Sequence, residues 1–236
     1  MKGRILFLAG TIAVLAGCGN DSDGSSATAV AADESTMRYS VSVANLTVNQ
    51  PMSPLAILAH NSDFKLFEIG SMASVELEYL AEGGSNAELI ALMDSNSSVG
   101  QGLSGNGLLL PGAADSVDVT LDSSYPYLSV ASMLVNTNDA FVGETGINVA
   151  GLAVGEKYTM NMSVWDSGTE GNDELASTIP GPAGGGEGFN ADRNDDDRVA
   201  FHSGVISQDD GLSSSALNAT HRFLNPGAQL VITRIE

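Results

Sequence analysis

The segment Trp165-Asp-Ser-Gly-Thr-Glu170 and the residues after it carry the clearest chemical potential. Asp166, Glu170, Asp173 and Glu174 place four carboxylates within nine residues of a glycine-bent stretch. Carboxylates are hard oxygen donors, and the chain has one cysteine and three histidines. This set favours Ca²⁺, which takes roughly six to eight oxygen ligands, over zinc or copper. A solvated acidic loop with no bound metal is the alternative interpretation of the same spacing.

The run Asp166-Ser-Gly-Thr169 also matches the signature of aspartic proteases. Their mechanism needs two carboxylates about 3 Å apart that share one proton. The sequence contains no second copy of the motif. A hydrolase that uses Asp166 is therefore the weaker alternative, and we expect a protein that is not an enzyme.

Two other groups could bind a cation. Asp192, Asn194 and Asp196 have the spacing of the first ligands of an EF-hand loop, but Asp197 stands where that loop needs glycine. This segment is either a second, weak cation site or a charged turn. His60 and His202 fall in predicted strands, where we expect core or hydrogen-bonding roles in preference to metal ligation.

The N-terminus has the pattern of an export signal. Lys2 and Arg4 precede the uncharged residues 5–16, and the end of this run forms the tetrad Leu15-Ala-Gly-Cys18 together with the next two residues. A basic start, a short apolar run and small residues are typical of a secretory signal. The apolar run is too short to cross a membrane, because a membrane span needs about twenty apolar residues. The tetrad resembles a bacterial lipobox, which implies cleavage after residue 17 and lipidation of Cys18. By resemblance to sorted lipoproteins, Gly19 favours the outer membrane.

The remaining chain divides into a tether and a domain. Residues 18–37 are rich in Ser, Ala, Asp and Gly and predict a flexible tether, and residues 38–236 predict one folded domain. The chain has 9 basic and 29 acidic residues, and its net charge is -20. This excess of acid excludes nucleic acid as a partner, because phosphate binding needs a basic face. The expected contacts are the membrane, through the lipid on Cys18, and an extracellular protein or glycan.

Alternation of apolar and polar residues predicts mainly β structure. Short segments with this alternation, separated by Gly, Pro or Asn, favour an antiparallel β-sandwich. Residues 73–79 fit both a strand and a helix, whereas residues 86–93 fit a helix with Gly83-Gly84 before it. The predicted strands are Tyr39–Val48, Pro54–His60, Ser116–Leu121, Tyr127–Val135, Lys157–Val164, Arg198–Ile206 and Gln229–Ile235.

Four blocks in order resemble the spondin domain, the N-terminal module of F-spondin and mindin. They are His60-Asn-Ser through Gly70, Ala73-Ser74 through Gly84, Ser129 through Gly143, and Trp165 through Glu170. The resemblance extends over residues 39–236. It implies a C2-like sandwich and a helical structure for residues 71–94.

The resemblance also implies a Ca²⁺ site near the last two blocks. Carried over by position, Asp166 and Glu170 are ligands and Asp139 is the third. Glu170 replaces an Asp of the family and reaches one methylene further. We therefore expect a Ca²⁺-binding recognition or adhesion module on a lipoprotein tether. The alternatives are a metal-free structural envelope lipoprotein and the hydrolase described above.

Overall fold

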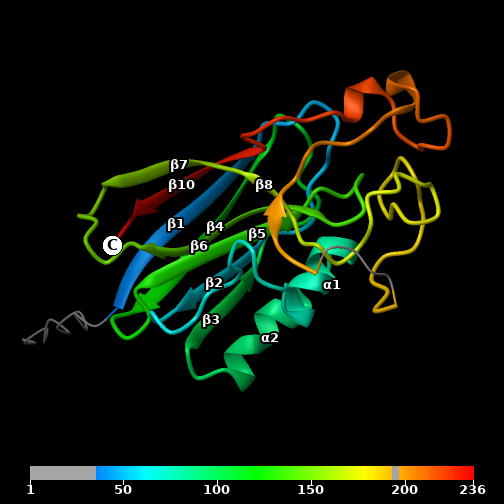
Figure 1. Ribbon diagram of the computed structural model, residues 1–236. Helices are drawn as coiled ribbons and strands as arrows, with labels where there is room; N and C mark the ends of the chain where they lie inside the picture. The colour runs from blue at the N-terminus through cyan, green and yellow to red at the C-terminus, as the bar shows by residue number, and fades with distance from the viewer. Residues whose placement is uncertain (1–35, 193–196) are drawn as a thin grey trace, which may run out of the picture. The chain divides into compact units, whose positions relative to one another are not determined.

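The computed structural model describes residues 36–192 and 197–236, and all of them belong to one compact unit that spans Glu34–Glu236. Their strands form two antiparallel sheets (Figure 1). The four-stranded sheet has the order β4-β1-β10-β7, and the six-stranded sheet has the order β3-β2-β5-β6-β8-β9. The predicted mainly β sandwich is confirmed. The first sheet consists of β1 (Thr36–Asn45), β4 (Ala114–Asp122), β7 (Lys157–Met162) and β10 (Ala228–Arg234).

The six-stranded sheet carries the chemistry discussed below. It consists of β2 (Ala56–His60), β3 (Val99–Ser104), β5 (Tyr127–Met133), β6 (Ala140–Asn148), β8 (Val164–Asp166) and β9 (Ala200–Phe201). Two helices, α1 (Val75–Gly83) and α2 (Ala87–Ser95), accompany this sheet. The short 3-10 turns Gln208–Asp210 and Ala219–His221 lie between β9 and β10.

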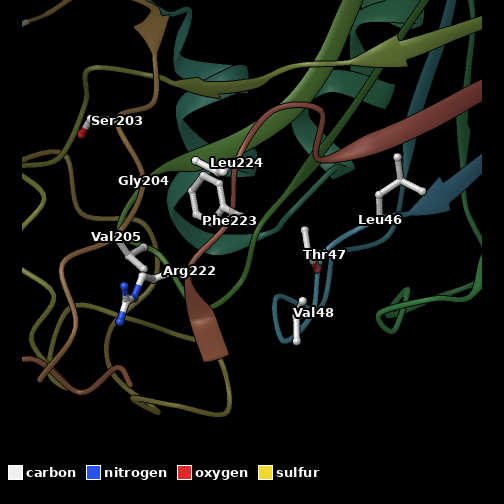
Figure 2. A pocket seen from close by; sticks show the side chains of 9 residues that line it. All are labelled: Leu46, Thr47, Val48, Ser203, Gly204, Val205, Arg222, Phe223 and Leu224. Atoms are coloured by element: carbon white, nitrogen blue, oxygen red, sulfur yellow. The ribbon is translucent and has the colours of Figure 1, made fainter. Parts of the chain in front are cut away.

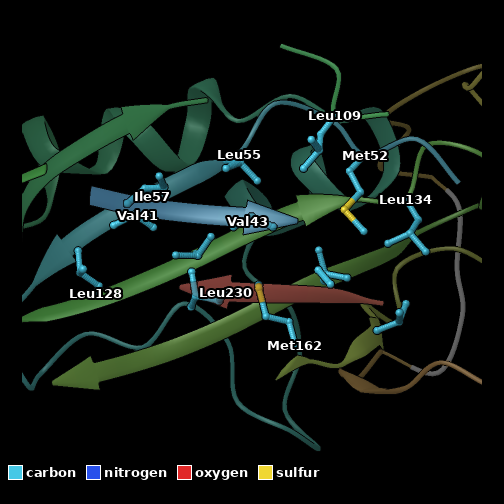
Figure 3. Packing of buried hydrophobic residues seen from close by; sticks show 14 of the residues in the cluster. Val41, Val43, Met52, Leu55, Ile57, Leu109, Leu128, Leu134, Met162 and Leu230 are labelled. Atoms are coloured by element: carbon cyan, nitrogen blue, oxygen red, sulfur yellow. The ribbon is translucent and has the colours of Figure 1, made fainter. Parts of the chain in front are cut away.

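The main core fills the space between the two sheets. Tyr39, Val41 and Val43 alternate along β1 with partly exposed residues, as the period of two predicts for a strand with one buried face. They pack with Leu230 of β10 and Leu128 of β5, in the cluster shown in Figure 3. The strand begins at Thr36, so the last two residues of the predicted tether belong to β1.

A second core lies between the six-stranded sheet and the helices. Leu58 of β2 and Phe141 of β6 face Leu77 and Leu80 of α1 within one buried cluster. Strand β2 is therefore buried on both faces. The predicted helical structure of residues 71–94 is confirmed. For α1 the reason is local, because the Ser74 hydroxyl accepts from the Leu77 N–H at the N-terminus and left-handed Gly84 ends the helix.

Several predictions about strands differ from the structure. The predicted strand Lys157–Val164 is divided between the two sheets, because β7 ends at Met162 and Val164 begins β8. Of the predicted strand Arg198–Ile206 only Ala200–Phe201 is a strand, because its partner β8 has three residues and Gly204 turns the chain at φ +90°. Strands β3 and β6 were not predicted as strands.

The outer strands of the first sheet are β4 and β7. Strand β4 carries Asp115, Asp118 and Asp122, and the last two are exposed. Arg38 on the neighbouring β1 forms an ion pair with Asp118 at 3.4 Å.

Candidate metal centre

Two of the three predicted ligands meet at one end of the six-stranded sheet. Asp139 directly precedes β6, Asp166 ends β8, and the antiparallel register pairs Ala140 with Asp166. The third residue at this place is His202, which directly follows β9. One ligand atom from each of Asp139, Asp166 and His202 lies within 4.8 Å of the other two. The strand pairing thus brings together carboxylates that are 27 positions apart in the sequence.

Asp139 is a fully buried carboxylate whose two oxygens differ. Oδ2 accepts from the Ser167 hydroxyl at 2.8 Å and from the N–H groups of Thr169 at 3.0 Å and Glu170 at 3.2 Å. Oδ1 is buried and has no hydrogen-bond partner within the described part of the chain. Burial, followed by the charge of Asp166, raises the pKa of Asp139 to about 7, against the lowering effect of its hydrogen bonds.

Asp166 is partly exposed and is held by a tight turn. Its Oδ1 accepts from the Gly168 N–H at 2.9 Å, and its Oδ2 accepts from Asn172 Nδ2 at 2.7 Å. Gly168 has φ +73°, and a Cβ at this position would overlap the backbone of Arg198. Only glycine therefore lets the loop after β8 fold back and direct the Asp166 carboxylate toward Asp139.

Glu170, the third predicted ligand, is buried beside the pair but is not a member of the three-residue group. Its N–H binds Asp139, and its carboxylate Oε1 accepts from Asn138 Nδ2 at 3.0 Å. The same amide donates to Asp173 Oδ1 at 3.1 Å. Asn138 therefore gathers two of the carboxylates that the sequence placed in the acidic loop.

Glu174 is a second buried carboxylate with an unusual backbone. Its φ is +59°, its Oε1 accepts from the Ile206 N–H at 3.0 Å, and its buried Oε2 has no hydrogen-bond partner among the described residues. Burial raises the pKa of Glu174 to about 7, the Ile206 hydrogen bond lowers it, and the charge of Asp173 raises it. Glu174 does not belong to the group of Asp139 and Asp166.

His60 and His202 both hold hydrogen-bonded positions, and His202 lies directly after β9. His60 is buried, with Nε2 at 2.7 Å from Ser129 Oγ and Nδ1 at 2.7 Å from the Asn61 carbonyl oxygen. His202 is also buried and contacts Asn172 and Gly204. Burial lowers the pKa of His202, and the charge of Asp166 opposes this effect. The proximity of His202 to the carboxylates was not predicted, because no motif in the sequence links it to them.

An open pocket of about 590 Å³ lies next to His202. Phe223 lines it and contacts the His202 ring, with centroids 5.2 Å apart, and Gly204 forms part of the same wall. Figure 2 shows Leu46, Val48 and Leu224, which are exposed apolar side chains, around this pocket. Its remaining polar side chains include Arg222, which forms an ion pair with Asp210 at 3.2 Å.

Several predictions concern residues that the structure does not describe. The signal segment 1–17, Cys18 and the tether up to residue 35 lie outside the described residues. The EF-hand-like site also lies largely outside them, because Asn194 and Asp196 are not described, whereas Asp192 is exposed. Within residues 36–192 and 197–236, no helix has the length and apolar character to cross a membrane.

The fold and the carboxylate pair define a β-sandwich module with a buried acidic centre between the ends of β6 and β8. A family model, Spondin_N, the spondin N-terminal domain, matches residues 46–180. The chain therefore belongs to the spondin N-terminal domain family, a family of non-enzymatic modules of the extracellular recognition type. No curated protein matches the chain significantly. The matched range includes Asp139, Asp166 and Glu170 and ends before His202.

Proposed function

We propose that the protein is a Ca²⁺-binding recognition or adhesion module, displayed on the bacterial cell envelope as a lipoprotein. Its family is consistent with recognition, and the carboxylates at the end of the six-stranded sheet support Ca²⁺ binding. The proposed ligands are Asp139, Asp166 and Glu170. Glu170 makes the smallest contribution, because its Oε1 is already bound to Asn138.

The Asp139 side chain is the observation that carries the proposal. A buried carboxylate oxygen without a donor is costly, and the cost grows when a second carboxylate lies within 4.8 Å. The three donors on Oδ2 fix the carboxylate so that Oδ1 stays available. A cation between Asp139 and Asp166 would satisfy this oxygen and remove the repulsion. Two carboxylates are donors that Ca²⁺ prefers.

The protein's own residues prepare this arrangement. Ser167 and the N–H groups of Thr169 and Glu170 orient Asp139, and Gly168 and Asn172 orient Asp166. When bound, Ca²⁺ supplies neutralising charge and coordination positions beyond those filled by the protein. An acidic group of an extracellular protein or glycan is the proposed partner at these positions.

Calorimetry of Ca²⁺ binding to the full chain tests the site. We expect binding by the wild-type protein and none by the double variant Asp139→Asn plus Asp166→Asn, while Glu170→Gln binds more weakly. Asp94→Asn is the matched control, because Asp94 is exposed on α2 and should not change binding. Absence of heat with the wild-type protein, together with a melting temperature that EDTA does not alter, would favour the metal-free structural lipoprotein.

The proposed display on the envelope rests on Cys18 and the residues around it. Metabolic labelling with a fatty-acid probe should mark the wild-type chain and not the Cys18→Ser variant. Fractionation of the envelope should place the labelled protein in the outer membrane. Labelling that persists in Cys18→Ser would refute the assignment of the anchor.

A further inference from the structure

A chain of four hydrogen-bonded groups runs from the backbone after β9 to the carboxylate of Asp166. The Gly204 N–H donates to His202 Nδ1 at 2.9 Å. His202 Nε2 lies 3.1 Å from Asn172 Oδ1, and Asn172 Nδ2 donates to Asp166 Oδ2 at 2.7 Å. His202 is 7% exposed, whereas Asn172 and its hydrogen bond to Asp166 are exposed. The same segments, β8 with its loop and β9 with its continuation, are also joined by two residue pairs of the sheet and by the His202 N–H, which donates to the Val164 carbonyl oxygen at 3.2 Å.

The hydrogen-bond partners of the two ring nitrogens, Gly204 and Asn172, determine the tautomer of His202. A backbone N–H can only donate, so Nδ1, which accepts from Gly204, carries no proton. Asn172 must direct its NH₂ group toward the Asp166 carboxylate, because its carbonyl oxygen there would face a negative oxygen. Its Oδ1 consequently faces His202 and needs a donor, which is Nε2–H. The Gly204 end excludes a proton on Nδ1 and the Asn172 end requires one on Nε2, so together they select the neutral Nε2–H form.

This form leaves His202 without a nitrogen for a metal. Nε2 carries a proton, and the lone pair of Nδ1 accepts from Gly204. Ligation by His202 would therefore need the loss of at least one hydrogen bond and a change of tautomer.

We propose that His202 is a positioning residue that acts on Asp166 through Asn172 and is not a metal ligand, so that the centre is an all-oxygen site for a hard divalent cation. This inference rests on the proposed function for the identity of the bound species. It adds two residues to the site, Asn172 and His202, the second of which lies outside the range matched by the family model. It also sets the expected selectivity. If His202 is not a ligand, the group of Asp139, Asp166 and His202 offers the metal only oxygen donors, which favour Ca²⁺ over Zn²⁺.

Ca²⁺ and Zn²⁺ titrations of the full chain and its variants test the inference. Outer residues that orient metal ligands typically change affinity about 10–100-fold, so His202→Ala and Asn172→Ala should each weaken Ca²⁺ binding by about tenfold. The variant with both substitutions should bind Ca²⁺ no more weakly than Asn172→Ala alone, because both residues act through one contact. His202→Gln offers an acceptor to Gly204 and a donor to Asn172, so it should stay within about threefold of wild type. Zn²⁺ affinity should be the same in wild type and His202→Gln.

The tautomer can be read directly and without any cation. A long-range ¹H–¹⁵N spectrum of the full chain should show His202 as the Nε2–H form, with its signals assigned by their loss in His202→Gln. An Nδ1–H form, or Zn²⁺ binding that His202→Gln abolishes, would overturn the inference. Loss of thermal stability in His202→Ala with unchanged Ca²⁺ affinity would also overturn it, because that is the result for a purely structural histidine. If wild type binds no Ca²⁺, the proposed function fails, and the tautomer alone then decides whether His202 holds Asn172.

Discussion

Replacing Glu174 with Gln should stabilise the folded protein at about pH 8 and have little effect at about pH 4. Burial raises the pKa of the Glu174 carboxyl from its ordinary value of 4.5 to about 7. Between these two values the folded protein holds a proton that the unfolded chain has released. The free energy of unfolding therefore falls as the pH rises through this interval, and it is constant on either side.

The size of the effect follows from the width of the interval. Each pH unit corresponds to about 1.4 kcal/mol, so the interval from 4.5 to about 7 corresponds to about 3–4 kcal/mol. Glutamine keeps an oxygen for the Ile206 N–H and does not ionise, so the variant lacks this dependence on pH. The Glu174→Gln variant should consequently gain about 3–4 kcal/mol over the wild-type protein above pH 7, measured in EDTA.

Urea denaturation followed by tryptophan fluorescence measures the difference. Trp165 is the single tryptophan and is buried, so its emission reports on the folded domain. Burial also raises the pKa of Asp139, and the slope that Asp139 causes is present in both proteins and cancels in the difference. Glu68→Gln is the control, because Glu68 is exposed and forms a surface ion pair with Lys65, and its effect should stay within about 0.5 kcal/mol. A difference between Glu174→Gln and wild type that does not change between about pH 4 and pH 8 would refute the reasoning.

Three further substitutions test the local structure by thermal or urea denaturation. Gly168→Ala should destabilise the protein by about 3 kcal/mol and weaken Ca²⁺ binding, because the φ of Gly168 is +73° and the added Cβ overlaps Arg198. The control Gly155→Ala, at a position with φ +83° and open space around it, should cost about 1 kcal/mol. Equal losses in the two variants would show that the overlap is unimportant. Leu77→Ala removes a side chain that is 0% exposed under α1 and should cost about 3 kcal/mol, so a loss below about 1 kcal/mol would contradict the packing of α1 on the sheet. Ser74→Ala removes the N-terminal cap of α1 and should cost about 1 kcal/mol, and a neutral effect would show that the cap does not stabilise the helix.

The fold was predictable for strands in which apolar and polar residues alternate, because one face of such a strand is buried. Tyr39, Val41 and Val43 alternate in the sequence, and these residues are buried in the structure. Strand β3 escaped prediction because Gly100 and Gly102 are typical of a turn. The structure gives a different reason for them: a Cβ at Gly102 would meet the backbone of Ile90 in α2 at 2.7 Å. Gly102 therefore lets α2 lie close to β3, whereas a Cβ at Gly100 would overlap the Tyr125 ring.

The candidate site was predictable only in part. Asp166 and Glu170 stand out by their spacing, whereas Asp139 came from the family resemblance. Its proximity to Asp166 depends on the register of β6 and β8, which local patterns do not specify. Asn172 and His202 follow from the course of two loops, and residue type alone gives no reason to connect them.

The outer strand β4 has a consequence for how copies of the protein behave when they are crowded together. An open strand edge can pair with the edge of another molecule, and charged side chains oppose this kind of growth. Strand β4 carries Asp115, Asp118 and Asp122, and Arg38 of β1 pairs with Asp118 at 3.4 Å but also with Glu236 at 2.6 Å. Two such edges would bring rows of like charge together, so part of the chain's acidity acts as protection against self-association.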